Sequence, residues 1–424
     1  MSMDYFRIQG GKRLKGRVRI SGSKNAALPI MAAALMCDGP VMLHNVPRLS
    51  DIDHMGLILS KLGVKVDWIG DGTLRLEVVD EANNHAEYDL VRKMRASICV
   101  MGPLLAKRGQ AQVAMPGGCA IGTRPVDLHV KGVEALGAEV ELIEGGDIVC
   151  RARRLQGAEI FLGGHFGSSV TATANILMAS VLAHGRTVIE SAACEPEVED
   201  LANFLNAMGA QITGQGSPRI TVEGVESLSG GEYDVIPDRI EAGTFMVAAA
   251  VTNGEVTLEN CRTEHLMAAT KTLEDVGVTV ERDNGNVVVA SSRHLMPAEI
   301  TTQPYPGFPT DLQAQFMVLL CLADGNSVIT EKIFPDRFLH VAELNRMGAR
   351  LRKEGPTVIV EGVKKLIGAP VMASDLRASA ALVLAGLLAK GSTEINRVYH
   401  IDRGYERIEE KFRALGADIV RLDK

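Results

Sequence analysis

Residues 311–351, DLQAQFMVLLCLADGNSVITEKIFPDRFLHVAELNRMGARL, contain one complete structural unit. The pattern predicts, in order, an apolar helix, a helix-ending glycine, an alternating strand, a loop, an amphipathic helix and a further strand: 311–323, Gly325, 327–331, the segment around Arg337, 340–347 and 349–351. Helices that alternate with strands in this way are typical of an α/β fold, in which helices pack on sheets.

Two markers of this unit recur along the whole chain. A glycine closes an Ala-, Leu- and Met-rich stretch at Gly39, Gly109, Gly185, Gly254, Gly325 and Gly391. A Leu/Met/Val-Gly-Ala/Val step follows 23 to 28 residues later, with its glycine at Gly63, Gly137, Gly209, Gly277, Gly348 and Gly416. Both series repeat every 66 to 76 residues. The chain therefore contains six copies of one unit.

The chain of 424 residues is too long for one core, and six units divide most simply into three per domain. The strand-like segment 6–8 precedes the first helix, and we expect it to complete the sheet of the sixth unit. This pairing predicts one discontinuous domain, 1–22 plus 239–424, and one continuous domain, 23–238.

The composition argues against several function classes. The 45 Lys and Arg against 52 Asp and Glu give a net charge of −7, so no general attraction to nucleic acid or to an anionic membrane is expected. No secretory signal is visible at the start, and the apolar run 26–37 is too short to span a bilayer. Seven scattered cysteines without a Cys-x-x-Cys pair suggest a reduced, cytoplasmic protein. We find no metal-ligand spacing and no nucleotide-binding loop, so neither a metal nor a cofactor is predicted.

Basic residues and helix starts together predict an anion site. Five of the six apolar helices are expected to begin at a small polar or acidic cap: Ser23, Ser169, Asp238, Thr310-Asp311 and Ser374-Asp375. Their positive dipole ends favour a bound anion. Arginines occur in the loops before the second helices, and further basic residues lie near the first helices: Arg48, Arg124, Arg262, Arg337 and Arg403, then Lys24, Arg95 and Arg377. Guanidinium groups match phosphate or carboxylate, although any single one could equally be a solvated surface arginine.

The second unit carries a longer loop, 116–125, with the sequence Pro-Gly-Gly-Cys-Ala-Ile-Gly-Thr-Arg-Pro. Its glycines predict a lid around Cys119. A thiol beside Arg124 and helix starts would have a lowered pKa, so Cys119 could act as nucleophile or proton donor. The alternative is an incidental small apolar cysteine. Asp311 and Asp375 could be plain helix caps, or one of them could accept a proton from a substrate hydroxyl.

Several motifs resemble one known family. They are 21–29 (SGSKNAALP), 94–97 (MRAS), 116–129 (PGGCAIGTRPVDLH), 309–311 (PTD), 375–379 (DLRAS) and 400–407 (HIDRGYER). Together they resemble the UDP-N-acetylglucosamine enolpyruvyl transferases, from about Phe6 to Val420. The resemblance implies an inside-out α/β barrel fold with two domains of three βαβαββ-type repeats. It also implies transfer of the enolpyruvyl group of phosphoenolpyruvate to the 3-hydroxyl of UDP-N-acetylglucosamine, at the first committed step of peptidoglycan synthesis, without a cofactor.

The resemblance also implies a role for individual residues. Cys119 would donate a proton to phosphoenolpyruvate and could attach to it covalently. The phosphate and carboxylate would be held by Lys24, Arg124 and Arg403, assisted by Arg95, Arg337 and Arg377. Asn25 and Asp311 would meet the sugar, with Asp311 as the base, and Asp375 would assist proton handling. The uridine-diphosphate side would be lined by Arg124, Pro125, Val126, Asp127, Leu128, Ser169, Val170 and Ile333.

The chain departs from the family pattern in two places. The segment 163–171 is longer, lacks a lysine and has Thr171 where a glycine is usual, and Pro335 replaces a more usual acidic residue. Three alternatives remain. An enolpyruvylshikimate-phosphate synthase would lack the Cys119 loop, and an RNA-cyclase-like protein would need a nucleotide motif. A sugar-nucleotide-binding paralogue without turnover would lack one of the key residues.

Overall fold

The computed structural model describes residues 4–115, 126–164, 167–283, 285–292 and 294–423. The described residues form two compact units. We call the described part of 22–236 the continuous unit, and the described parts of 1–21 and 237–424 the split unit. Each unit has a hydrophobic core of its own.

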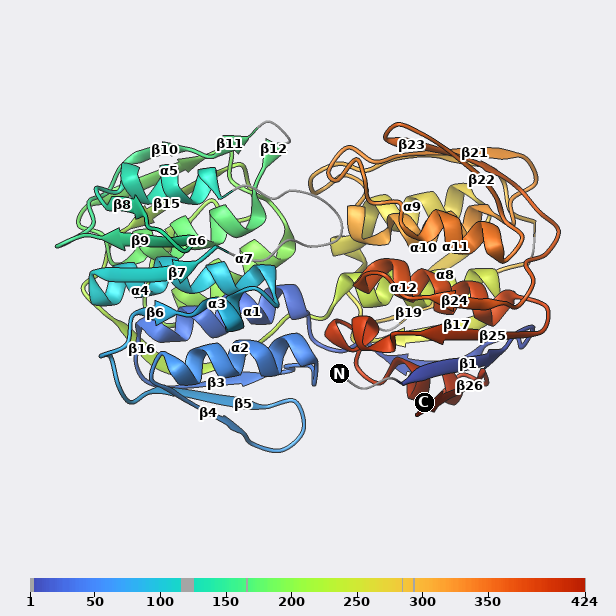
Figure 1. The fold of residues 1–424 in the computed structure, drawn as a ribbon, viewed down its shortest axis with the longest axis horizontal. Coiled ribbons are helices and arrows are strands. Elements are labelled where there is room, and N and C mark those ends of the chain that lie inside the picture. Colours follow the sequence, from blue (N-terminus) through green and yellow to red (C-terminus); the bar gives the residue numbers. More distant parts are fainter. Residues whose placement is uncertain (1–3, 116–125, 165–166, 284, 293, 424) are drawn as a thin grey trace. The chain divides into compact units, whose positions relative to one another are not determined.

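The continuous unit alternates helices with short strands (Figure 1). Its helices, with η for a 3-10 helix, are α1 (Lys24–Ala33), η1 (Ala34–Met36), α2 (Ser50–Lys61), α3 (Tyr88–Val91), η2 (Arg95–Val100), α4 (Met101–Arg108), α5 (Asp127–Ala135), α6 (Val170–Val181) and α7 (Pro196–Ala207). Its strands are β3 (Cys37–His44), β4 (Val64–Trp68), β5 (Leu74–Val78), β6 (His85–Ala86), β7 (Gln110–Ala114), β8 (Glu139–Leu142), β9 (Asp147–Arg151), β10 (Glu159–Phe161), β11 (Gly163–Gly164), β12 (Gly167–Ser168), β13 (Arg186–Glu190), β14 (Gln211–Thr213), β15 (Arg219–Glu223) and β16 (Leu228–Asp234).

The split unit is built in the same way. Its helices are α8 (Arg239–Val251), η3 (Thr263–Leu266), α9 (Met267–Asp275), η4 (Thr310–Leu312), α10 (Gln313–Leu320), α11 (His340–Arg346), α12 (Leu376–Leu388), η5 (Val398–Arg403) and α13 (Ile408–Ala414). Its strands are β1 (Tyr5–Gln9), β2 (Lys15–Arg19), β17 (Glu255–Glu259), β18 (Thr279–Asp283), β19 (Asn286–Ala290), β20 (Glu299–Thr301), β21 (Asn326–Thr330), β22 (Arg350–Glu354), β23 (Thr357–Glu361), β24 (Pro370–Met372), β25 (Ser392–Asn396) and β26 (Asp418–Leu422).

Three four-stranded sheets in each unit share one topology. The orders are β16-β3-β5-β4, β6-β7-β9-β8 and β10-β13-β15-β14 in the continuous unit, and β2-β17-β19-β18, β20-β21-β23-β22 and β24-β25-β1-β26 in the split unit. In each sheet the first two strands pair parallel and the other neighbours pair antiparallel. The repeat predicted from the glycine spacings is therefore a repeat of sheet topology.

The N-terminal strand confirms the expected pairing. Phe6 of β1 lies opposite Ile395 of β25 on one side and Arg421 of β26 on the other. β1 thus takes the third place in the sheet of the last repeat. In each of the other five repeats, this place belongs to the strand that comes directly after the fourth-place strand in the chain.

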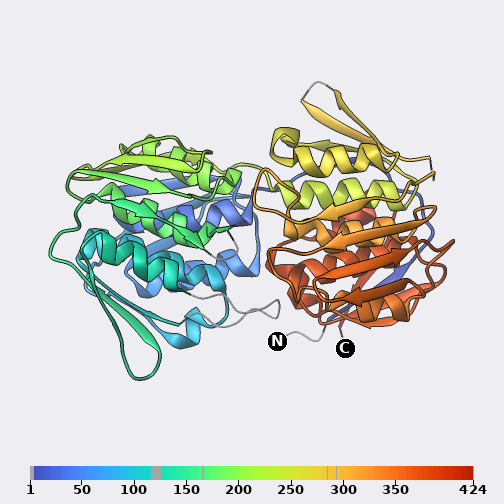
Figure 2. The ribbon, with the colours of Figure 1, turned by 90° about the horizontal axis from the view of Figure 1, so that it is seen from above.

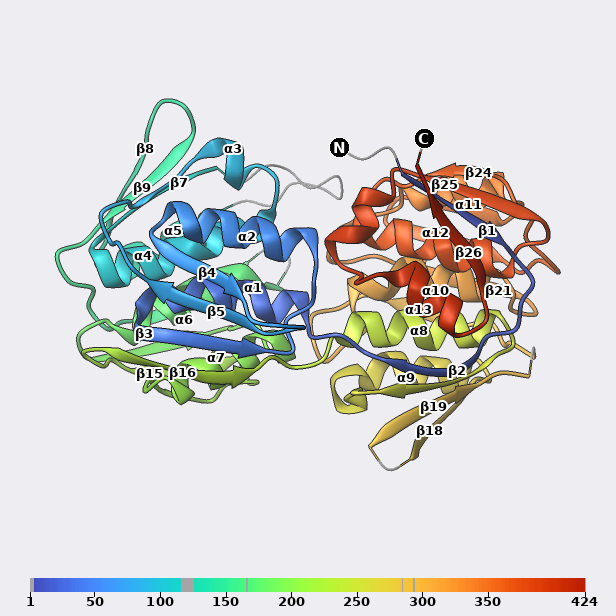
Figure 3. The ribbon, with the colours of Figure 1, turned by 90° about the horizontal axis from the view of Figure 1, so that it is seen from below.

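Apolar helices fill the centre of each unit, and the sheets lie outside them (Figures 2 and 3). In the split unit, α8, α10 and α12 contact one another, and nearly all of their residues are buried. The sequence of α12, LRASAALVLAGLL, shows why: small alanines allow close helix packing, and its one charged residue stands in the first turn. Arg377 stands in the first turn of α12, Asp375 caps that helix, and Asp311 lies in η4, which leads directly into α10.

The second helices end as the sequence predicts. In α11, the N–H of Ala349 donates to the carbonyl of Leu344 (3.1 Å), and Gly348 between them has φ +90°. Glycine is favoured here because a side chain strains this left-handed backbone. The same left-handed glycine recurs at Gly63, Gly137, Gly209, Gly277 and Gly416.

The first glycine series needs a correction. Of its six members, all of them described, only Gly109 is a helix cap, at the end of α4 with φ +69°. Elsewhere the helix ends earlier, as in α12, which stops at Leu388 while Gly391 lies in the turn before β25. The helices are therefore shorter than the apolar runs that predicted them, because buried turns are apolar too. Within the described residues, no helix combines the length and the apolar character that a membrane crossing requires.

Candidate functional site

Asp311 lies between two arginines of the split unit. Its Oδ1 accepts a hydrogen bond from Arg337 Nη1 at 2.8 Å, and its Oδ2 accepts one from Arg377 Nε at 3.1 Å. Both arginine side chains are buried, whereas the Asp311 side chain keeps 28% of its surface exposed. An ionised carboxylate held in this way presents an acceptor to solvent beside two fixed positive charges.

Arg377 is held by burial as well as by Asp311. Its guanidinium lies 5.2 Å from the centre of the Tyr405 ring, a cation–π contact inside the core. The Tyr405 hydroxyl shares hydrogen bonds with Thr244 at 2.9 Å and Gln315 at 3.2 Å. Burial raises the pKa of Tyr405, so the phenol stays neutral. The arginine therefore has a rigid, uncharged support.

Of the two candidate acids, only Asp375 is a helix cap. Asp375 is the N-cap of α12, where its Oδ1 accepts from the N–H groups of Arg377 and Ala378 at 3.0 and 3.1 Å. Asp311 instead lies inside η4, and its carboxylate turns to the arginines. The interpretation of Asp311 as a plain helix cap is therefore wrong.

Two histidines lie in the electrostatic neighbourhood of Asp375. Burial lowers the pKa of His340, with Arg337 acting in the same direction and Asp375 against it. Burial also lowers the pKa of His400, which is further lowered by Arg403 and raised by Asp375. The split unit therefore gathers Asp311, Asp375 and three arginines, at positions 337, 377 and 403, around neutral imidazoles.

In the continuous unit, Lys24 forms a buried ion pair. Ser23 is the N-cap of α1, and Lys24 follows as its first residue. The Lys24 Nζ lies 3.0 Å from Oδ2 of Asp51 in α2, and both side chains are less than a tenth exposed. Asp51 orients the ammonium group at the start of α1, where Asn25 is partly exposed beside it.

A buried histidine joins α5 to α6. Gly102 N donates to Oδ1 of Asn175 at 2.9 Å, so the amide Nδ2 is free to donate to Nδ1 of His129, also at 2.9 Å. Nε2 of His129 then donates to the hydroxyl of Thr171 at 3.2 Å. Burial and Arg95 lower the pKa of His129 to about 3, so the imidazole is neutral.

This link brings together most of the residues expected on the uridine side. Val126 is the N-cap of α5, Asp127 and Leu128 follow, and Leu128 lies against Gly164 of the β11–β12 hairpin. Ser169 caps α6 by accepting from Ala172 N at 3.3 Å, and Val170 begins that helix. Ile333 belongs to the split unit, between β21 and α11.

The remaining predictions fall into two groups. Arg95 begins η2 and acts electrostatically on both Cys99 and His129. Cys119, Arg124 and Pro125 lie outside the described residues. Sequence reasoning assigned no role to Asp51, His129, Tyr405 or the buried carboxylate Glu331, although His129 and Tyr405 stand inside two of the quoted motifs and Asp51 is an acid in the first turn of α2.

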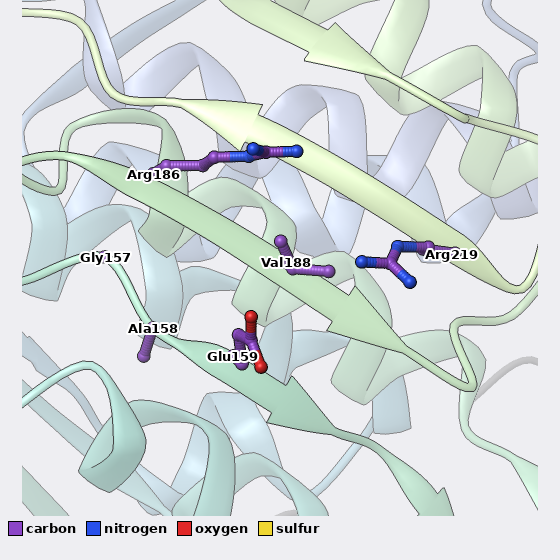
Figure 4. A pocket seen from close by; sticks show the side chains of 6 residues that line it. All are labelled: Gly157, Ala158, Glu159, Arg186, Val188 and Arg219. Carbon is purple, nitrogen blue, oxygen red and sulfur yellow. The ribbon is translucent and has the colours of Figure 1, made fainter.

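A surface hollow of about 280 Å³ lies on the sheet of β10 and β13 (Figure 4). Its arginines are exposed and paired: Arg186 with Glu223 at 3.4 Å, and Arg219 with Glu190 at 2.9 Å. Exposed pairs of this kind contribute little, and none of the predicted site residues that the structure describes lines the hollow.

Comparison with known proteins identifies the family. A family model described as EPSP synthase (3-phosphoshikimate 1-carboxyvinyltransferase) matches residues 8–412. A UDP-N-acetylglucosamine 1-carboxyvinyltransferase of Methylacidiphilum infernorum is 52% identical over 420 residues, covering 99% of each chain. One from Carboxydothermus hydrogenoformans is 54% identical over 422 residues, covering 99% of this chain and 100% of the relative. This chain belongs to the UDP-N-acetylglucosamine 1-carboxyvinyltransferase family.

Solved structures agree with the family on the fold. The enolpyruvyl transferase NikO from Streptomyces tendae matches with a TM-score of 0.90 and 25% identity, over 100% of both chains. An EPSP synthase from Acinetobacter baumannii matches with a TM-score of 0.76 and 20% identity over the same share, which concerns the fold alone. The expected α/β fold of the carboxyvinyltransferases is therefore confirmed.

Proposed function

We propose that this chain transfers the enolpyruvyl group of phosphoenolpyruvate to the 3-hydroxyl of UDP-N-acetylglucosamine and releases phosphate, the first committed step of peptidoglycan synthesis. The observation that carries this proposal is the sequence identity of 52% and 54%, over 99% of this chain, to relatives named for this activity. The buried arginines Arg337 and Arg377 and the partly exposed carboxylate of Asp311 suit a reaction between two anionic substrates.

The basic side chains are proposed to hold the phosphoenolpyruvate. Lys24, Arg124 and Arg403 bind its phosphate and carboxylate, assisted by Arg95 and by two further arginines, Arg337 and Arg377. In support, Lys24 is fixed by Asp51, and the Arg377 guanidinium is fixed by Asp311 and Tyr405. Fixed cations stabilise the charge that develops on a departing phosphate without reorganisation.

The chemistry proceeds by addition and then elimination. Cys119 donates a proton to the methylene carbon, which makes the neighbouring carbon electrophilic. The sugar hydroxyl adds to that carbon while Asp311 takes its proton, giving a tetrahedral ketal. Loss of a methyl proton and of phosphate then restores the carbon–carbon double bond as an enol ether. Asp375 assists proton handling, and Asn25 contacts the sugar.

The acceptor's uridine diphosphate is proposed to contact the first turns of α5 and α6 and the residue Ile333. The bond from His129 to Thr171 supports this assignment, because it ties these two turns to each other. Thr171 thus has a structural use in this chain where the family usually has glycine. A cytoplasmic location is part of the same proposal, supported by six described cysteines that are all free thiols.

Release of phosphate from phosphoenolpyruvate tests the proposal. UDP-N-acetylglucosamine and shikimate 3-phosphate are supplied in parallel, because the matching family model is named for the second acceptor's enzyme. Release with the sugar nucleotide alone is expected. Release with shikimate 3-phosphate alone would assign the other transferase activity, and silence with both would favour a binding protein without turnover.

A further inference from the structure

Glu331 is a fully buried carboxylate directly after β21. Among the described residues, no lysine or arginine forms an ion pair with it. Four donors satisfy it instead. Its Oε1 accepts from Thr302 Oγ1 at 2.7 Å and from the backbone N–H groups of Ile333 and Phe334 at 2.8 and 2.9 Å. Its Oε2 accepts from Thr310 Oγ1 at 2.9 Å.

These bonds connect three segments that are apart in sequence. Thr302 follows β20, Thr310 begins η4, and 333–334 lie in the loop that leads to Arg337. Because β20 and β21 pair in parallel, with Thr301 opposite Thr330, the ends of both strands meet at Glu331. Burying a charge without a cation is costly, so this site needs every one of its hydrogen bonds.

The bonds also have a fixed direction. A carboxylate only accepts, so the single hydroxyl proton of Thr310 must point at Glu331. The Thr310 oxygen then accepts from Arg337 Nη1 at 2.9 Å, and the same nitrogen donates to Asp311 at 2.8 Å. A chain of hydrogen bonds therefore runs from Glu331 through Thr310 and Arg337 to Asp311.

We propose that Glu331 is a positioning residue for the enolpyruvyl transfer: through Thr310 it fixes Arg337 against Asp311, and through the 333–334 backbone it fixes the loop that carries Ile333. This inference rests on the proposed function. It assigns Glu331 no contact with either substrate, and it gives the buried carboxylate beside the loop a function.

The change Glu331→Gln separates the hydrogen bonds at Oε1 from the hydrogen bond at Oε2. If the amide oxygen keeps the place of Oε1, the bonds from Thr302 and the loop backbone survive. The amide nitrogen then faces the Thr310 oxygen and can only donate to it, so the bond is reversed and the Thr310 hydroxyl proton loses its acceptor. We expect kcat/KM for the sugar nucleotide to fall about tenfold or more, since a hydrogen bond to a charged group is lost.

The test is a double-mutant cycle of Glu331→Gln and Thr310→Val, measured by phosphate release. If Glu331 acts through Thr310, both single variants lose activity and the double variant loses little more than either. Thr310→Ser keeps the hydroxyl and should restore most of the activity lost in Thr310→Val. The Thr310→Ser and Thr310→Val variants both retain Glu331, so their comparison tests the chain of hydrogen bonds even if Glu331→Gln folds poorly.

Glu409→Gln is the matched control, a buried carboxylate of the same unit whose partner is Arg421 at 2.8 Å. Its kcat/KM should stay within about twofold of the unchanged chain, since it adjoins none of the hydrogen bonds considered. The inference would be overturned if the activity losses of Glu331→Gln and Thr310→Val multiply in the double variant, as they do for independent residues. Equal activity losses in Thr310→Ser and Thr310→Val would also overturn it. An unchanged chain that releases no phosphate would instead refute the proposed function.

Discussion

At the scale of single residues, Asp311 is the group on which the proposed chemistry depends most. Asp311→Asn keeps the shape but removes the negative charge that accepts the proton from the sugar hydroxyl. We expect kcat to fall by about two to three orders of magnitude, a typical loss for a general base. Steady-state phosphate release measures it, with the exposed Asp324→Asn as control. A kcat within about threefold of the unchanged chain would assign the base elsewhere.

Cys119 provides a second prediction at this scale. Cys119→Ala should abolish the covalent adduct with phosphoenolpyruvate and most turnover while leaving folding intact. Intact-protein mass spectrometry detects the adduct. Cys194→Ala is the control, because burial raises the pKa of Cys194 and keeps its thiol protonated. Adduct formation in the Cys119 variant would remove this thiol from the mechanism.

His129 makes stability depend on pH. Its pKa is lowered to about 3 when folded, against an ordinary value of 6.5. Between these values the unfolded chain binds a proton that the folded chain does not, so the free energy of unfolding falls as the pH falls from 6.5 toward 3. The contribution is at most about 1.4 kcal/mol for each pH unit. Urea unfolding between about pH 7 and pH 5 should show a weaker pH dependence in His129→Gln, and an identical slope would contradict the buried neutral imidazole.

At the scale of elements, the recurring glycine after each second helix gives the sharpest test. Gly137 follows α5 with φ +88°, and a Cβ added there would meet no other atom within 4 Å, so Gly137→Ala tests backbone strain alone. We expect the free energy of unfolding to fall by about 1 kcal/mol. Gly56→Ala, inside α2, should instead be neutral or stabilising, because alanine favours helix. Equal effects in thermal unfolding would show that the left-handed turn is not what requires glycine.

At the scale of the whole molecule, the sequence predicted the periodic features and missed those that depend on distant residues. The spacing of Gly348 and its equivalents predicted the repeats, and the strand-like segment 6–8, which precedes the first helix, predicted that β1 completes the last sheet. The repeat made both predictions possible, because it shows which strand each unit needs. The short helices were missed because buried turns are as apolar as helices.

The supports of the candidate site were beyond prediction for a related reason. Asp51 meets Lys24 across 27 residues, and Thr302 meets Glu331 across 29. No local pattern marks such pairs, because each partner alone resembles an ordinary helix cap or loop residue. The cap interpretation of Asp311 failed because only the fold brings two arginines to it from later segments of the chain.

The central claim is that the enolpyruvyl group moves to one hydroxyl of the sugar nucleotide. The most direct test is nuclear magnetic resonance of the product formed from phosphoenolpyruvate labelled with carbon-13. A pair of vinyl protons should appear, with the labelled carbon coupled to the sugar proton at position 3 and phosphate released in equal amount. Phosphate release with free pyruvate, or an ether at another hydroxyl, would contradict the account.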